Sequence, residues 1–195
     1  MGEATSKILG RIHTSLTSTP PKHILILGLS SVGKVTMLKK LFPSKEVKES
    51  IPTIGMAMKT VEDDNGFKYT ACNLGWGSIR ALFRHYYKTA AGIIFVVDAE
   101  DKQRLDLARD TLHDMATDLD EVKKQGIPIL VMANKQDLSG AASTSELVEA
   151  LKLNKLAKFE WHIQAASAID RENDSAFGVH EGFAWIRSAI RKQTP

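Results

Sequence analysis

GLSSVGKV, residues 28–35, decides the fold of this 195-residue chain. Gly28, Gly33 and Lys34 have the spacing of the phosphate-binding loop G-x-x-x-x-G-K-[ST], whose backbone N–H groups surround phosphate and whose lysine reaches the terminal phosphates. A chance turn would explain the glycines, but the motif also requires a buried strand before it and a helix after it. The apolar run HILIL at 23–27 and a helical pattern beyond the loop meet both requirements. The stretch therefore predicts a strand, a phosphate-binding loop and a helix in succession.

The overall composition indicates one globular domain and excludes several classes of protein. With 43% hydrophobic and 25% charged residues, the chain is long enough to bury a substantial core. A net charge of +3 is too small to indicate a nucleic-acid partner. The single cysteine, Cys72, excludes an intrachain disulfide and fits a reducing compartment. No apolar run reaches the roughly 20 residues needed to cross a bilayer. We expect a cytoplasmic monomer.

Strands and helices are predicted to alternate along the rest of the chain. Extended runs at 56–61 and 67–73 flank an Asn-Gly turn, and apolar runs at 92–97, 129–133 and 159–164 follow. Helical spacing of apolar residues covers 105–122 and 183–190, and Ser143 with Glu146 forms a capping box that begins another helix. This alternation predicts a mainly parallel sheet covered on both faces, with ligands bound at the carboxyl ends of its strands.

The tetrapeptide NKQD, residues 134–137, follows one of these buried strands and indicates a base. A carboxylate at Asp137 can accept hydrogen bonds from N1–H and the exocyclic amino group of guanine, whereas adenine offers neither donor pair there. Four residues alone are a weak signal, and a polar helix-capping loop is the alternative. Together with the phosphate loop, Asn134, Lys135 and Asp137 favour guanine. Ser167 and Ala168, after the last strand, are expected beside the same base.

These motifs, taken together, resemble the ADP-ribosylation factor and Arf-like small GTPases, from about residue 21 to residue 190. PTIG at 52–55, RHYY at 84–87, GIIFVVD at 92–98 and WHIQA at 161–165 are similar to that family in wording and order. The resemblance implies an α/β, three-layer P-loop NTPase fold of the Ras type. Its six-stranded, mostly parallel sheet would carry one antiparallel edge strand and helices on both faces. Residues 1–20 would be a membrane-associating segment and residues 21–195 the nucleotide-binding domain.

The resemblance also implies GTP or GDP as ligand, Mg²⁺ as cofactor and two switch segments, around Thr53 and at 73–84, that bind effector or regulatory proteins. The residues expected at the nucleotide are Gly28, Leu29, Ser30, Ser31, Val32, Gly33, Lys34, Val35, Thr36, Thr53, Gly75, Asn134, Lys135, Asp137, Ser167 and Ala168. Lys34 would stabilise the phosphates.

Three positions depart from the family pattern. Val35 replaces the threonine that ligates Mg²⁺, and Thr36 does not restore it, because one residue along a helix turns the side chain by about 100°. Asn73 replaces the aspartate that holds the water shell of the metal. The family motif W-D-x-G-G-Q reads CNLGWGS here, one residue shorter and without the glutamine that orients the attacking water. Thr53 remains as a weak Mg²⁺ ligand. Trp76 is either an anchor for a partner or a plug in the γ-phosphate site.

The amino terminus indicates membrane attachment. MGEATS at 1–6 fits M-G-x-x-x-[ST], which makes Gly2 a candidate for myristoylation. Ile8, Leu9, Ile12 and Leu16 lie near one helical face, the alternative being a disordered polar leader. One acyl chain binds a membrane only marginally, so we expect reversible association with intracellular membranes.

Three hypotheses of function follow. The first is an Arf-like regulatory switch or scaffold in vesicle trafficking that binds GTP or GDP and hydrolyses it poorly, a pseudo-GTPase. The second is an active GTPase that depends on an activating protein. The third is a structural subunit with the same fold and no nucleotide. Lys34, Asn134 and Asp137 argue against the third, and Val35 and the missing glutamine argue against the second.

Overall fold

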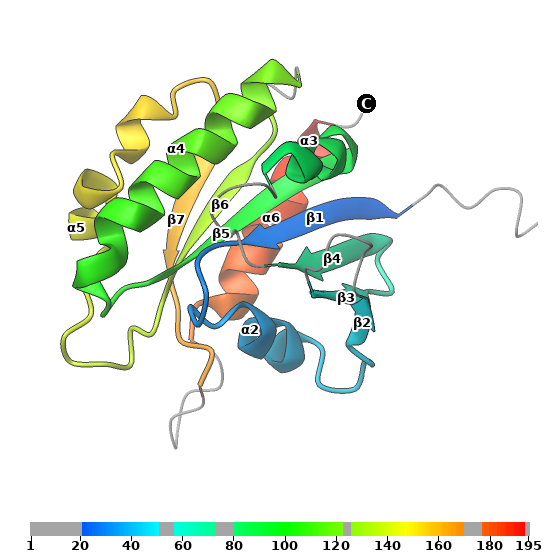
Figure 1. Ribbon diagram of the computed structural model, residues 1–195. Helices are drawn as coiled ribbons and strands as arrows, with labels where there is room; N and C mark the ends of the chain where they lie inside the picture. The colour runs from blue at the N-terminus through cyan, green and yellow to red at the C-terminus, as the bar shows by residue number, and fades with distance from the viewer. Residues whose placement is uncertain (1–20, 51–56, 73–79, 123–125, 170–176, 194–195) are drawn as a thin grey trace, which may run out of the picture.

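The computed structural model describes residues 21–50, 57–72, 80–122, 126–169 and 177–193. Within these ranges seven strands alternate with helices and two short 3₁₀ helices (Figure 1). In chain order the elements are β1 (Lys22–Leu27), α2 (Lys34–Leu41), β2 (Lys48–Ser50), β3 (Met58–Glu62), β4 (Phe67–Ala71), α3 (Arg80–Thr89), β5 (Ala90–Asp98), η1 (Lys102–Arg104), α4 (Leu105–Glu121), β6 (Ile129–Asn134), α5 (Thr144–Ala150), η2 (Leu153–Lys155), β7 (Trp161–Ala165) and α6 (Val179–Lys192).

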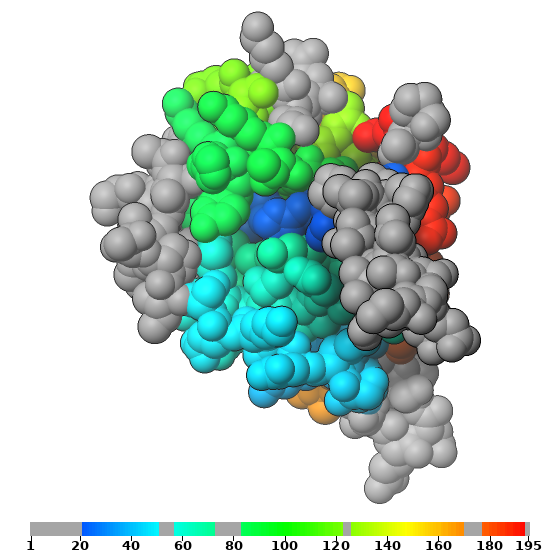
Figure 2. Space-filling model, turned by 90° about the vertical axis from the view of Figure 1, so that its right-hand side faces the viewer, coloured from blue at the N-terminus to red at the C-terminus, as the bar shows by residue number. Residues whose placement is uncertain are grey.

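One sheet contains all seven strands in the order β2-β3-β4-β1-β5-β6-β7. β4, β1, β5, β6 and β7 pair in parallel, and β3 pairs antiparallel with both β4 and β2. The predicted fold class is confirmed, with one strand more than expected. The extra strand, β2, contains three exposed residues and no apolar pattern that could have revealed it. Figure 2 faces this edge of the sheet, and the cyan residues around β2 lie at the surface.

The centre of the sheet is the core of the protein because its strands are buried on both faces. Every residue from Ile24 to Leu27 and from Ile129 to Ala133 is fully buried, as expected for parallel strands covered by helices. In Figure 1, α4 lies in front of the sheet and α6 lies behind it. Because helices cover both faces, the loops that connect strands and helices lie at the two ends of the sheet. A ligand can reach the backbone in these loops, and in α/β sheets it binds at the carboxyl ends of the strands.

The predicted hairpin between β3 and β4 is held by one nearly buried carboxylate. Asp63 Oδ1 accepts hydrogen bonds from the backbone N–H of Asn65 at 2.8 Å and of Phe67 at 2.9 Å. The Tyr69 hydroxyl donates to Asp63 Oδ2 at 3.2 Å, and Arg187 of α6 forms an ion pair with the same oxygen at 3.6 Å. The turn is therefore fixed both to its own strands and to the last helix.

The structure also confirms the predicted start of one helix. Ser143 and Glu146 form the predicted capping box at the start of α5. Cys72 is buried, and burial raises the pKa of its thiol to about 12. Trp161 and Trp185 are only partly buried, although both pack against the core. None of the helices in the described ranges is long and apolar enough to span a membrane.

Candidate functional site

The phosphate-loop motif forms a tight turn between β1 and α2 that requires its two glycines. Gly28 has φ +143° and Gly33 has φ +98°, values that residues with a side chain rarely adopt. A Cβ at Gly28 would lie 2.4 Å from the carbonyl oxygen of Val96, and one at Gly33 would lie 2.2 Å from Asn134 Nδ2. The loop is therefore packed closely against β5 and β6. Ser30 and Ser31 face the solvent, whereas Leu29 and Val32 are buried.

Lys34 turns back over the loop from the first turn of α2. Its ammonium group donates to the carbonyl oxygens of Gly28 at 3.1 Å and Leu29 at 2.5 Å, and the residue is only 5% exposed. Burial lowers the pKa of Lys34 to about 8; the nearby Cys72 thiol opposes this shift and the positive charge of Arg104 adds to it. A buried cation whose charge is poorly compensated favours the approach of an anion.

The N–H groups of the loop have no backbone acceptor among the described residues. In the described part of the chain, none of the backbone hydrogen bonds outside the helices and strands has an N–H of residues 29–33 as its donor. The carbonyl groups of the same loop accept hydrogen bonds from the side chains of Lys34, Arg104 and Asn134. A turn whose N–H groups have no backbone acceptor in the described segments, next to the amino end of a helix, fits a phosphate group.

Asn134, at the end of β6, connects the phosphate loop to the loop after β7. Its Nδ2 donates to the carbonyl oxygen of Val32 at 2.8 Å, and its Oδ1 accepts from the N–H of Ala168 at 3.1 Å. Asn134 is 2% exposed, so water does not compete for either bond. One side chain thus brings together three of the segments that the sequence assigned to nucleotide binding.

The side chain predicted to read guanine is oriented by a neighbour on the loop after β7. The Ser167 hydroxyl donates to Asp137 Oδ1 at 2.7 Å. The same hydroxyl oxygen accepts from the N–H of Ile169 at 3.3 Å, so Ser167 is itself fixed. Asp137, Ser167 and Ala168 therefore lie together, as the sequence predicted.

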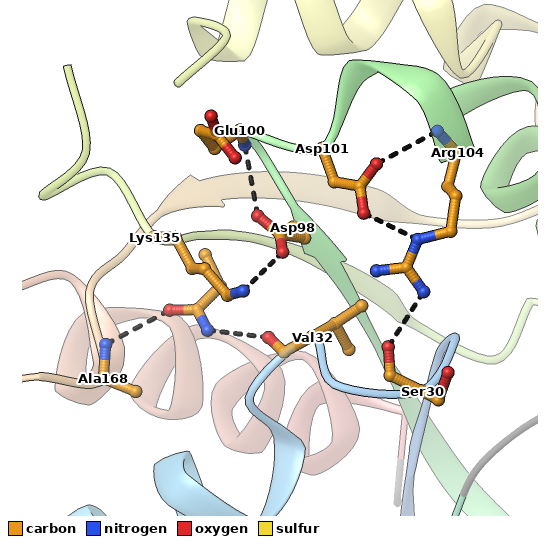
Figure 3. A network of polar contacts seen from close by, with 9 residues as sticks. Ser30, Val32, Asp98, Glu100, Asp101, Arg104, Lys135 and Ala168 are labelled. Carbon is orange, nitrogen blue, oxygen red and sulfur yellow. Dashed lines mark hydrogen bonds and ion pairs between the residues drawn. The ribbon is translucent and has the colours of Figure 1, made fainter. Parts of the chain in front are cut away.

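Two contacts made by positively charged side chains at this end of the sheet were not predicted (Figure 3). Lys135 forms an ion pair with Asp98 at 2.5 Å, and Asp98 also accepts from the N–H of Glu100 at 3.2 Å. Arg104 donates to the carbonyl oxygen of Ser30 at 3.1 Å. Asp98 could have been found, because it ends a buried strand at the same edge as Asn134. The contact of Arg104 with Ser30 spans 74 residues of sequence and has no local signal.

The position of the missing metal ligand is occupied by an apolar contact. Val35 is half-buried and packs against the core, and Thr36 is exposed. Within the described residues, no three His, Cys, Asp or Glu side chains are grouped so that they could hold a metal ion. Gly2, Thr53, Asn73, Gly75 and Trp76 lie outside the described residues.

Comparison with known proteins places this arrangement in a family. The model of the ADP-ribosylation factor family matches residues 8–190. ADP-ribosylation factor K of Dictyostelium discoideum is 39% identical over 171 residues, which cover 87% of this chain and 86% of the relative. The family consists of small GTPases that bind guanine nucleotide and regulate trafficking. With its phosphate loop, its NKQD segment and these matches, the chain belongs to the ADP-ribosylation factor family.

Proposed function

We propose that this protein binds GTP or GDP between the phosphate loop and the NKQD segment, hydrolyses GTP poorly, and acts as a membrane-associated regulatory switch or scaffold in trafficking. The phosphates would lie against residues Gly28 to Thr36, with the ammonium group of Lys34 as their main positive charge. The guanine base would lie between the NKQD segment and the loop of Ser167 and Ala168.

The proposal of nucleotide binding rests on which backbone groups of the phosphate loop form hydrogen bonds and which do not. Side chains engage the carbonyls of Gly28, Leu29, Ser30 and Val32, whereas the N–H groups of residues 29–33 have no backbone partner of the kind described above. Three of these N–H groups belong to the buried or half-buried residues Leu29, Val32 and Gly33, and such backbone donors are rarely left without a partner in native proteins. A phosphate supplies several acceptor oxygens at once, which makes it the natural partner for these donors.

The preference for guanine rests on Asp137. Ser167 fixes one carboxylate oxygen at 2.7 Å, which orients the group before a base arrives. Leaving such a carboxylate without its donors costs about 1–3 kcal/mol for each missing hydrogen bond. Adenine lacks the two adjacent donors that guanine offers, so guanosine nucleotides should bind more tightly than adenosine nucleotides.

Poor hydrolysis is proposed because the groups that position water and metal are replaced. Phosphoryl transfer depends on the positioning of the attacking water and on the stabilisation of charge on the phosphate. A glutamine supplies the first and Mg²⁺ supplies the second. Val35 offers methyl groups where the family has a hydroxyl, and it packs against the core instead. Asn73 and the missing glutamine remove two further contributions. Nucleotide binding loses less, since Lys34 and the loop N–H groups do not depend on the metal.

Membrane association is proposed from residues 1–20. Myristoylation at Gly2 would supply one hydrophobic anchor and the segment around Ile8 to Leu16 a second, and two weak anchors together give reversible binding. The measurement is the mass of the amino-terminal peptide from a eukaryotic host, with a Gly2→Ala variant as control. An unmodified Gly2 would contradict this part of the proposal.

Nucleotide content and single-turnover hydrolysis test the main proposal. The full-length protein is denatured, its bound nucleotide is identified by chromatography, and GTP hydrolysis is followed with and without Mg²⁺. Val35→Thr restores the hydroxyl and should raise the dependence of nucleotide retention on Mg²⁺. Thr117→Val removes an exposed hydroxyl in helix α4, where it donates to the carbonyl oxygen of His113, and is the matched control, for which we expect no change.

Each outcome separates the three hypotheses. Bound guanine nucleotide with negligible turnover supports the proposal. Hydrolysis that requires Mg²⁺ and proceeds at the rate of an ordinary switch contradicts impaired catalysis and favours a working GTPase. A protein that contains no nucleotide and cannot be loaded contradicts nucleotide binding and favours a structural subunit.

A further inference from the structure

The carbonyl of Ser30, in the middle of the phosphate loop, is held from outside the loop. Arg104 Nη1 donates to this oxygen at 3.1 Å (Figure 3). Arg104 is the last residue of η1, in the connection between β5 and α4. A residue far away in the sequence therefore controls the direction of one peptide group in the loop.

The side chain of Arg104 is itself fixed before it reaches the loop. Asp101 Oδ2 accepts from Arg104 Nε at 2.6 Å, and Asp101 Oδ1 accepts from the backbone N–H of Arg104 at 3.3 Å. The side chains of Arg104 and Asp101 are 34% and 26% exposed, so water screens this pair only in part. Asp101 thus orients the guanidinium group, and the guanidinium group orients the Ser30 carbonyl.

The geometry of the peptide bond connects this contact to the ligand. A trans peptide is planar, and its C=O and N–H point in opposite directions. Holding the Ser30 carbonyl toward Arg104 therefore turns the Ser31 N–H toward the opposite side of the loop. Ser31 has φ +64°, a left-handed conformation that costs a residue with a side chain about 1–2 kcal/mol.

We propose that Arg104 is a positioning residue for nucleotide binding: by holding the Ser30 carbonyl, it keeps the Ser31 N–H directed at the phosphates. This inference rests on the proposed binding of guanine nucleotide. The positive charge of Arg104 also reaches the phosphate loop, because it contributes to the lowered pKa of Lys34. Arg104 consequently acts through the backbone of the loop and also strengthens the attraction of the site for anions.

The test measures the dissociation of a fluorescent GDP analogue from the full-length protein. Arg104→Gln should speed dissociation about tenfold, the effect of losing one hydrogen bond from a charged donor. Asp101→Asn should have a smaller effect, and the double variant should not exceed Arg104→Gln, because Asp101 acts through Arg104. Arg109→Gln is the matched control, since Arg109 lies on the following helix and pairs with Asp106 and Asp110 instead of the loop.

Two further measurements distinguish positioning from general stability. Arg104→Lys keeps the charge but not the guanidinium fork, so it should restore only part of the slow dissociation. Thermal unfolding of the nucleotide-free variants reports any structural role separately. A lower midpoint for Arg104→Gln with unchanged dissociation would assign Arg104 a structural role and overturn the proposal.

The remaining outcomes are also distinguishable. If the wild-type protein retains the analogue and Arg104→Gln retains it equally long, the inference about Arg104 is wrong and the proposed function stands. If the wild-type protein retains no guanine nucleotide, both are overturned. Effects of Asp101→Asn and Arg104→Gln that simply add would show that Asp101 does not act through Arg104, and would overturn the orienting chain.

Discussion

Replacing Asn134 by alanine tests whether one buried amide holds the candidate site together. Its Nδ2 and Oδ1 bond to the carbonyl of Val32 and the N–H of Ala168, at 2.8 and 3.1 Å. Val32, Asn134 and Ala168 are all buried, at 2%, 2% and 6% exposure. The substitution therefore leaves one acceptor and one donor of the backbone without partners and out of reach of bulk water.

The expected loss of stability follows from these two groups. A buried polar group that loses its partner costs about 1–3 kcal/mol, so the two together give about 2–6 kcal/mol. This is a large share of the 5–15 kcal/mol that typically separates folded from unfolded states. Because Asn134 also fixes the phosphate loop, we expect the same variant to lose guanine nucleotide faster than the wild type.

The assay is urea unfolding of the nucleotide-free protein, followed by tryptophan fluorescence. Gln136→Ala is the control, because Gln136 lies in the same tetrapeptide and donates a single half-buried bond, to the carbonyl of Ala142 at 2.9 Å. Its expected cost is about 0.5–1.5 kcal/mol. If Asn134→Ala loses no more stability than Gln136→Ala, then Asn134 does not connect the three loops and the reasoning fails.

Three further predictions concern charge, backbone and the hairpin. A bound phosphate should raise the pKa of Lys34 from about 8, because its negative charge stabilises the ammonium group. Nucleotide binding should therefore take up a proton, and the affinity should fall as the pH rises above 8. Calorimetry in two buffers of different ionisation enthalpy measures this proton uptake. Gly178→Ala should cost more than about 2 kcal/mol in chemical unfolding, because its Cβ would lie 1.8 Å from the Ala165 carbonyl oxygen at φ +69°. Asp63→Ala should cost about 2–5 kcal/mol, since three hydrogen-bond donors lose their acceptor and Arg187 loses its ion-pair partner. Asp64→Ala, at a side chain 86% exposed, should cost less than about 1 kcal/mol.

Each of these predictions has a result that contradicts it. Equal heats in the two buffers would mean that Lys34 does not change its protonation on binding. For the glycine, Gly182→Ala serves as the comparison, because its contact below 3.0 Å is with the flexible side chain of Met132. Equal losses for Gly178→Ala and Gly182→Ala would show that the backbone at Gly178 relaxes. Equal losses of stability for Asp63→Ala and Asp64→Ala would show that the Asp63 carboxylate does not hold the hairpin turn.

The elements that the sequence predicted are those whose burial leaves a pattern. Strands β1, β5 and β6 read as continuous apolar runs because both of their faces are covered. β2 contains three exposed residues and has no such pattern. Helix α3 was not predicted as a helix either; its residues were noted only as the end of the second switch segment, at 73–84, and for the motif RHYY at 84–87.

The site shows the same division between local and distant information. The phosphate loop, Asn134 and Asp137 were predicted because each follows a buried strand and has a recognisable spacing. The contact of Arg104 with Ser30 depends on how α4 packs beside the loop, which no short stretch of sequence encodes. The ion pair of Lys135 with Asp98 likewise joins two strand ends that become neighbours only in the folded sheet.

The residues that hold the phosphate loop lie far behind it in the sequence, and this separation has a consequence for biosynthesis. A growing chain that has left the ribosome only as far as α2 contains every atom of the phosphate loop. It does not yet contain Arg104, Asn134 or Ala168, which hold or complete that loop. Because β6 and β7 are made late, the site can mature only when most of the domain has been synthesised. Guanine nucleotide should therefore act on a nearly finished chain, where it stabilises the completed fold rather than starting it.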